Sequence, residues 1–181
     1  HMPLILKPDN GRSSEGVFRI ANREALTRAL LELRMLGRAD TYLAQPFVSG
    51  RVVCVDTVRD RAGNTVALAR EEHLRSQRGA GLSVQVFRDS ELEAICGALA
   101  AELGVIGCVN FEFIKDAGGK YHFLECNPRF SGGIGFSERA GLPAVRLHLG
   151  AWRGESIPED ITERITPGWQ VKKYIEVVTK E

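Results

Sequence analysis

Two segments with the pattern of β-hairpins constrain the fold of this chain more than any other feature. Residues 105–114 and 120–126 alternate apolar with polar side chains and flank the turn Ala117-Gly118-Gly119. Residues 51–59 and 65–70 form a similar pair around Ala62-Gly63-Asn64. Because a hairpin joins antiparallel strands, this pattern predicts an α+β fold with antiparallel sheets rather than a doubly wound parallel sheet.

Single helices are predicted between the hairpins. Asn22 should cap a helix that ends at Gly37, and the capping box Ser90-Glu91-Leu92-Glu93 should open a second helix that ends at Gly104. The other expected elements are strands at 4–7, 16–20, 42–46 and 171–178, a polar Arg-rich loop after residue 70, and a helix from about residue 134. Pro46 should end its strand or lie at a sheet edge, because it has no N–H to donate.

The composition excludes several classes of protein. The 181 residues are 44% hydrophobic and 26% charged, and the formal net charge is only +1, which is typical of a soluble globular chain without the basic field of a nucleic-acid binder. No apolar run approaches the roughly 20 residues that cross a bilayer. We therefore expect a cytoplasmic protein with neither nucleic acid nor a membrane as partner. The four cysteines form no CxxC pair and are expected to be reduced core thiols: Cys54, Cys96, Cys108 and Cys126.

Oxygen-bearing side chains gather in the hairpin at 105–126. Asn110 and Glu112 share one face of their strand, and Glu125 and Asn127 share one face of the next. Carboxylate and amide oxygens are the ligands that Mg²⁺ prefers, with the remaining positions left to water and phosphates. The alternative is a solvent-exposed polar face of a half-buried hairpin. His122 is predicted to lie on the opposite side from Glu125, and no histidine has a partner at ligand spacing.

The segment Phe123-Leu-Glu-Cys-Asn-Pro-Arg129, followed by Phe130-Ser-Gly-Gly133, resembles the signature of ATP-grasp enzymes, nearest to the carbamoyl-phosphate synthase large-chain group. The resemblance implies that Glu125 bridges two magnesium ions, that Asn127 holds one, and that Arg129 faces the transferred phosphoryl group. It also places Asn110 at a further metal contact. Glu112 competes for that role for two reasons. The separation from Asn110 to Glu125 along the chain is longer than in the usual form of this hairpin in the family, and an amide is a weaker metal ligand than a carboxylate.

The beginning of the chain agrees with this resemblance. Leu6-Lys7-Pro8 is similar to the family's lysine-bearing strand, and Gly11 to Val17 is similar to its glycine-rich loop over the phosphates. Lys7 would offer a point charge to phosphate oxygens. The loop would offer backbone N–H groups left accessible by its small residues, Gly11, Ser13, Ser14 and Gly16.

The middle of the chain resembles the family hinge that receives adenine. Main-chain groups from Gln45 to Val48 would read the base edge, with Phe47 or Val48 against its ring. Pro46 departs from the family pattern, since an acidic residue is frequent there and proline removes an N–H. Arg75 and Arg78, with Arg70 before them, resemble the basic stretch that faces phosphate. For each arginine the alternative is an ordinary surface position.

The resemblance implies two small α+β lobes, residues 3–48 and 49–181, that enclose a nucleotide cleft. Residues 1–2 resemble a cloning scar, and the family's N-terminal domain is expected to be missing ahead of them. The implied activity uses ATP and Mg²⁺, with Mn²⁺ as a possible replacement. It activates a small carboxylate as an acyl phosphate for attack by an amine or ammonia. Two alternatives stay open: a nucleotide-binding fragment that is inactive alone, and a non-catalytic scaffold with the same fold.

Overall fold

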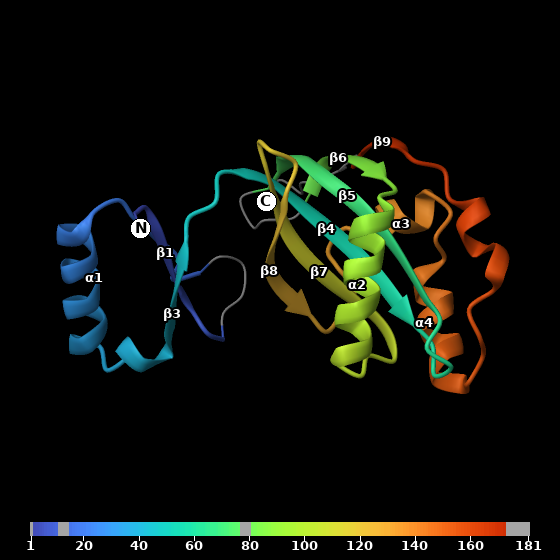
Figure 1. The fold of residues 1–181 in the computed structure, drawn as a ribbon, viewed down its shortest axis with the longest axis horizontal. Coiled ribbons are helices and arrows are strands. Elements are labelled where there is room, and N and C mark those ends of the chain that lie inside the picture. Colours follow the sequence, from blue (N-terminus) through green and yellow to red (C-terminus); the bar gives the residue numbers. More distant parts are fainter. Residues whose placement is uncertain (1, 11–14, 77–80, 173–181) are drawn as a thin grey trace, which may run out of the picture. The chain divides into compact units, whose positions relative to one another are not determined.

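The chain divides into two compact units, His1–Ser49 and Gly50–Glu181, in a computed structural model (Figure 1). The structure describes residues 2–10, 15–76 and 81–172. Each unit has its own antiparallel sheet, so the α+β organisation expected from the hairpins is present in both.

The first unit contains a three-stranded sheet and one α-helix. Its elements are β1 (Leu4–Pro8), β2 (Phe18–Ile20), α1 (Arg23–Met35), the 3₁₀ turn η1 (Ala39–Thr41) and β3 (Tyr42–Pro46), with strand order β2-β1-β3. Asn22 caps α1 as predicted, because its Oδ1 accepts the Ala25 N–H at 2.9 Å. Pro46 ends β3, which is an edge strand, again as predicted. A small core of Leu6, Ile20 and Leu33 joins sheet and helix.

The second unit contains a six-stranded sheet with strand order β8-β7-β4-β5-β6-β9. Its strands are β4 (Gly50–Arg59), β5 (Thr65–Arg75), β6 (Gly81–Phe87), β7 (Gly107–Asp116), β8 (Tyr121–Asn127) and β9 (Gly168–Val171). Its helices are α2 (Ser90–Glu102), α3 (Ile134–Arg139), α4 (Ala144–Arg153) and the 3₁₀ helix η2 (Glu159–Arg164). Figure 1 shows α2 in front of this sheet and α3 and α4 behind it.

Each face of the larger sheet has its own apolar core. Against α2 lie Val53, Val55, Phe111 and Phe113, in contact with Leu92, Cys96 and Ala100 of the helix. On the other face, Val58, Leu68, Val84 and Val86 pack against residues of α3, α4 and η2. The cysteines are free thiols, with Cys54, Cys96 and Cys108 buried and Cys126 half-buried, as predicted.

Three sequence predictions of elements were wrong. The Arg-rich stretch after residue 70 is not simply a loop, because β5 continues to Arg75 and a further strand, β6, follows at Gly81–Phe87. The N-cap of α2 is Asp89 rather than Ser90, since the Asp89 side chain accepts the Leu92 N–H. The last described strand begins at Gly168 rather than residue 171, and residues 173–178 of the predicted strand lie outside the described residues.

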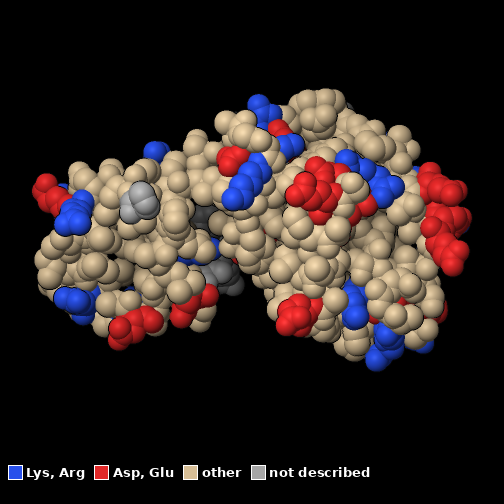
Figure 2. All heavy atoms as spheres, in the orientation of Figure 1, with Lys and Arg blue, Asp and Glu red and all other residues tan. Residues whose placement is uncertain are grey.

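The surface carries charges of both signs. On the face drawn in Figure 2, Lys and Arg side chains are interspersed with Asp and Glu, in line with the net charge of +1. Among the residues described, no helix is long and apolar enough to cross a membrane.

Candidate functional site

Two rows of mostly polar residues cross the larger sheet on the face opposite α2. The first row, from β5 to β8, is Arg70, Cys54, Glu112 and Glu125, and each residue pairs with the next across the strands. The second row is Leu68, Asp56, Asn110 and Asn127. Cross-strand partners lie on the same face of a sheet, so Asn110, Glu112, Glu125 and Asn127 share one face.

The β7–β8 end of these rows forms a hydrogen-bonded cluster. The Asn127 Nδ2 donates to Glu125 Oε1 at 2.9 Å and to Glu112 Oε1 at 3.4 Å. The Arg129 Nη2 donates to Asn127 Oδ1 at 3.1 Å, and the Arg129 N–H donates to the Asn127 carbonyl at 2.7 Å. Glu112, Glu125, Asn127 and Arg129 are therefore in contact in one continuous group.

The electrostatics of the cluster favour a cation beside Glu112. Burial raises the pKa of the Glu112 carboxyl, and the facing Glu125 carboxylate raises it further, against a smaller lowering by Arg75. Arg75 forms a close ion pair with Glu72, Nε to Oε2 at 2.6 Å, whereas its Nη2 is 3.9 Å from Glu112 Oε2. Two neighbouring carboxylates with one distant guanidinium leave negative charge that a cation can balance.

Asn110 and Glu112 differ in their access to solvent. Asn110 is only 1% exposed; its Nδ2 is 3.5 Å from the Phe111 carbonyl, and its Oδ1 has no hydrogen-bond partner among the described residues. Glu112 is half-buried, and its carboxylate accepts a hydrogen bond from Asn127 and lies near the Arg75 guanidinium. Of the two, Glu112 is therefore the side chain placed to meet an ion that arrives from solvent.

The donor set fits magnesium better than a metal held by protein ligands alone. In the described ranges, no group of three or more His, Cys, Asp or Glu side chains is arranged to hold a metal ion. Magnesium needs only one or two carboxylates when nucleotide phosphates and water complete its shell. Glu112 and Glu125, with the amide of Asn127, supply that minimum.

The first unit holds Lys7 and the glycine-rich loop, which were predicted to meet the nucleotide phosphates. Lys7 is on β1, the central strand, where it pairs with Leu43 of β3. Gly16 has φ +73°, and a Cβ there would lie 2.7 Å from Tyr42 Oη, so this position requires glycine. Gly11, Ser13 and Ser14 lie outside the described residues.

The predicted adenine hinge has part of its hydrogen-bonding capacity already in use. The Phe47 N–H donates to the Pro3 carbonyl at 3.1 Å, and Gln45 and Pro46 pair with Ile5 and Leu4 of β1. The guanidinium of Arg19 lies 4.1 Å from the centre of the Phe47 ring. The Phe47 amide is therefore not open to a base here, while adenine binding by the remaining groups of Gln45 to Val48 stays a prediction.

A family model described as "ATP-grasp in the biosynthetic pathway with Ter operon" matches residues 38–176, well over half of the chain. The chain belongs to this ATP-grasp family. The family was predicted from the segment at 123–133, and that prediction is confirmed.

Its relatives include carboxylases and synthases. Biotin carboxylase 2 of Bacillus subtilis (strain 168) is 27% identical over 139 residues, which make up 70% of this chain and 31% of that protein. The carbamoyl phosphate synthase large chain of Thermoplasma acidophilum is 24% identical over 162 residues, 81% of this chain and 15% of that protein. The ATP-grasp chain thus spans less than a third of the length of either relative.

A solved structure shows the same fold. The biotin carboxylase domain of Hydrogenobacter thermophilus 2-oxoglutarate carboxylase, in complex with MgADP, ADP and bicarbonate, has a TM-score of 0.77 to this chain. The match covers 93% of this chain and 40% of that one at 21% identity. The predicted fold class, an ATP-grasp of α+β type with antiparallel sheets, is therefore confirmed.

His122, just before the ATP-grasp signature, lies on a different face from the one that the sequence predicted. A β-bulge pairs Glu112 with Glu125 but Phe113 with Phe123, so that Leu124 is the extra residue. Because His122 then pairs with Ile114, it lies on the face of Glu125, not opposite to it, with its Nε2 2.7 Å from Asp116 Oδ2.

The basic stretch is also divided. Arg70 does not face solvent or phosphate: it is 2% exposed and its Nη1 donates to Asp56 Oδ2 at 2.6 Å. Arg75 lies beside Glu72 and Glu112, and Arg78 is outside the described residues. The buried pair was missed because Asp56 and Arg70 stand on different strands, and the only available signal was the apolar neighbours of Asp56 on β4.

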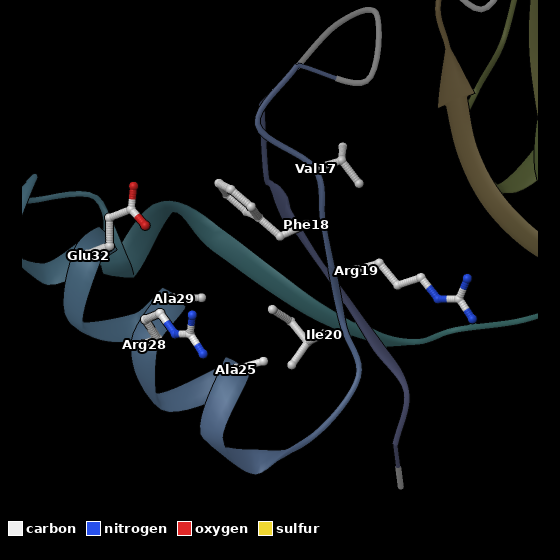
Figure 3. Close-up of a pocket in the computed structure, with 8 residues that line it drawn as sticks. All are labelled: Val17, Phe18, Arg19, Ile20, Ala25, Arg28, Ala29 and Glu32. Atoms are coloured by element: carbon white, nitrogen blue, oxygen red, sulfur yellow. The ribbon is translucent and has the colours of Figure 1, made fainter.

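A shallow depression in the first unit lies away from Lys7 and from the predicted adenine hinge, Gln45 to Val48. It has a volume of about 390 Å³ and lies beside α1 and β2. In Figure 3, Phe18 and Ile20 point toward the helix residues Ala25 and Ala29, whereas Arg19 points away from the helix. Of its lining residues only Val17 belongs to the segment that was predicted to lie over the phosphates, and the others were not predicted to bind nucleotide or metal.

Proposed function

We propose that this chain is the ATP- and Mg²⁺-binding part of a ligase that activates a carboxylate as an acyl phosphate for attack by an amine or ammonia. The observation that carries the proposal is the contact group of Glu112, Glu125, Asn127 and Arg129 at the β7–β8 edge. Family membership supports it, as does the MgADP and bicarbonate in the Hydrogenobacter complex, since bicarbonate is itself a small oxyacid.

In this proposal, Glu125 and Asn127 hold magnesium, and Glu112 rather than Asn110 is the further ligand. Glu112 is half-buried and already touches Asn127, whereas Asn110 lies beneath the surface. Without an ion, the Asn127 NH2 group bonds to both carboxylates and its Oδ1 accepts from Arg129, so the amide would turn its oxygen toward the ion on binding. The ion supplies charge neutralisation at the nucleotide phosphates, and Mn²⁺, which takes the same oxygen ligands, is the expected substitute.

The protein's own groups then position the reactants. The substrate carboxylate is the nucleophile toward the γ-phosphate, so no side-chain nucleophile is required. Arg129 can hold phosphoryl oxygens with two parallel N–H donors, and Lys7 offers a compact charge to phosphate oxygens. We assign further contacts with phosphate oxygens to Arg75, Arg78 and the backbone N–H groups of the loop residues Gly11, Ser13, Ser14 and Gly16. The hinge residues Gln45, Pro46, Phe47 and Val48 are proposed to receive the adenine.

The activity is proposed for the protein that contains this chain, because the chain spans 31% and 15% of the two relatives. The expected partners are ATP, a small carboxylate, an amine or ammonia, and an N-terminal domain of the ATP-grasp type. Two other outcomes are distinguished by experiment: a nucleotide-binding unit without turnover of its own, and a scaffold that binds no nucleotide.

Calorimetric titration of this chain with ADP, with and without Mg²⁺, tests the proposal. We expect magnesium to strengthen ADP binding, and Glu125→Gln to weaken that magnesium-dependent binding by about 10–100-fold without unfolding the chain. Glu102→Gln, at the exposed end of α2, is the matched control and should behave as wild type. Undetectable ADP binding would support the non-catalytic scaffold. Formation of ADP from ATP that increases when a carboxylic acid substrate is added would identify an active ligase.

A further inference from the structure

The buried ion pair between Arg70 and Asp56 lies under the segment that carries Arg129. Asp56 is fully buried, and its Oδ2 accepts both Arg70 Nη1 and Ser137 Oγ at 2.6 Å. The pair therefore connects β5 and β4 with α3, which follows directly after residues 129–133. Burying two charges is costly, and apolar residues of similar size often serve stability as well or better. Stability alone therefore does not account for a buried pair at this position.

Gly133 is seated against the buried guanidinium. A Cβ at this position would lie 2.6 Å from Arg70 Nε, 2.8 Å from Cζ and 2.9 Å from Nη2. The Gly133 φ is −104°, an ordinary value for any residue, so the glycine is required by the neighbouring side chain and not by the backbone conformation. The Arg70 guanidinium thus lies directly against the backbone of Gly133.

The same segment is held by other contacts. Lys172 Nζ donates to the Gly132 carbonyl at 2.7 Å, and the Ile134 N–H donates to the Ser131 carbonyl at 3.2 Å. The Phe130 ring packs edge-on against His148 of α4, with ring centres 5.0 Å apart. Since Arg129 is exposed and bonds only to its chain neighbours in the contacts above, its position depends on how this segment is anchored.

We propose that Arg70, held in place by its ion pair with Asp56, is a positioning residue. It fixes the distance between the segment 129–133 and the sheet, and so aligns Arg129 and Asn127 at the metal and phosphate site. This inference rests on the proposed function, because it concerns the same site. It adds a role for three residues that touch neither metal nor nucleotide: Asp56, Arg70 and Gly133. The expected signature is a loss of metal-dependent binding with the fold retained.

Two glycines of the same region provide a matched test. Gly133→Ala forces the guanidinium and the segment apart, whereas Gly135→Ala, inside α3, places a methyl group where no atom lies within 4 Å. We expect Gly133→Ala to weaken Mg-ADP binding about tenfold or more, as loss of a supporting contact does, and to leave binding of ADP without metal unchanged. Gly135→Ala should match wild type in both titrations.

A third variant keeps the test valid if Gly133→Ala is merely unstable. Arg70→Lys retains the charge but removes the planar group, so the methyl group that Gly133→Ala adds has room beside the slimmer side chain. In that background Gly133→Ala should cost clearly less metal-dependent affinity than in wild type, a non-additivity expected for residues in contact. Additive effects, or equal behaviour of Gly133→Ala and Gly135→Ala in a wild type that shows metal-dependent binding, would overturn this inference alone. A wild type without metal-dependent binding would overturn the proposed function and this inference together.

Discussion

Arg129 presents an exposed guanidinium that uses only part of its hydrogen-bonding capacity. It donates to Phe130 and Asn127, which leaves several of its five N–H groups for a ligand. An ion pair with Glu138 would give Arg129 a structural role instead, but the structure forms no such pair between these two described residues. Instead, Glu138 Oε1 accepts the Val145 N–H at 2.9 Å and caps the start of α4.

Arg129→Lys separates a catalytic role from a structural one. Lysine keeps the positive charge but lacks the two parallel N–H donors of the guanidinium. Its interaction with the phosphoryl oxygens in the transition state should therefore be weaker. In the protein that contains this chain, we expect kcat for ADP release to fall on the order of 100-fold, with little change in the KM for ATP. Arg139→Lys at the exposed end of α3 is the control. A lower melting temperature with a near-normal kcat would instead assign Arg129 to structure.

At the scale of elements, the start of α2 is connected to the hairpin of the candidate site. Asp89 Oδ1 accepts the Leu92 N–H at 3.0 Å, and Asp89 Oδ2 accepts the Tyr121 hydroxyl at 2.9 Å. One side chain thus caps the helix and ties it to β8. Ser90, which the sequence pattern places at the cap, is instead the first helical residue.

Asp89→Ala should destabilise the chain by about 1 kcal/mol, as loss of an N-cap does, while Ser90→Ala should be nearly neutral. The hydrogen bond from the Leu92 N–H is the main cause that lowers the pKa of Asp89 below its ordinary value. The contribution of Asp89 is therefore fully present above the unfolded-state pKa of about 3.9 and is lost as the pH falls through the lower folded pKa. Chemical unfolding from pH 7 to pH 3 measures this: the difference between wild type and Asp89→Ala should shrink with acid, and equal effects of both variants would show that the cap assignment is wrong.

At the scale of the whole molecule, the two units have cores of very different size. Among its described residues, the first unit has a buried apolar cluster of three side chains, Leu6, Ile20 and Leu33. The second buries two extensive clusters, one on each face of its sheet. Stability within a chain follows the local density of buried contacts, so the units should differ in protection.

Native-state hydrogen exchange should reveal this difference. We expect amides of β1 and α1 to exchange more than about tenfold faster than those of the central strands β4 and β7, because less buried apolar surface is lost when the first unit opens. Resolved amide exchange of this chain by NMR is the measurement. Equal protection in both sheets would show that the units open together and would contradict the prediction.

The sequence alone determined the features that depend on residues close in the chain. Turn glycines and alternating apolar residues were enough to predict the hairpins β4–β5 and β7–β8, because both signals act between neighbours. Asn22 marked the start of α1 for the same reason, since a cap bonds to an N–H three residues away. The ATP-grasp family was also evident from one continuous segment, 123–133.

The tertiary structure decided the features that depend on partners far apart in the chain. Strand β6 was hidden in an Arg-rich stretch because it is defined by pairing with β5 and β9. From the sequence Arg70 resembled a surface arginine, but it pairs with Asp56, 14 positions earlier, and Ser137, 81 positions after Asp56, donates to the same carboxylate. A charged side chain is buried only where an opposite charge and hydrogen bonds compensate its desolvation, and those groups come together only when the sheet and α3 have packed.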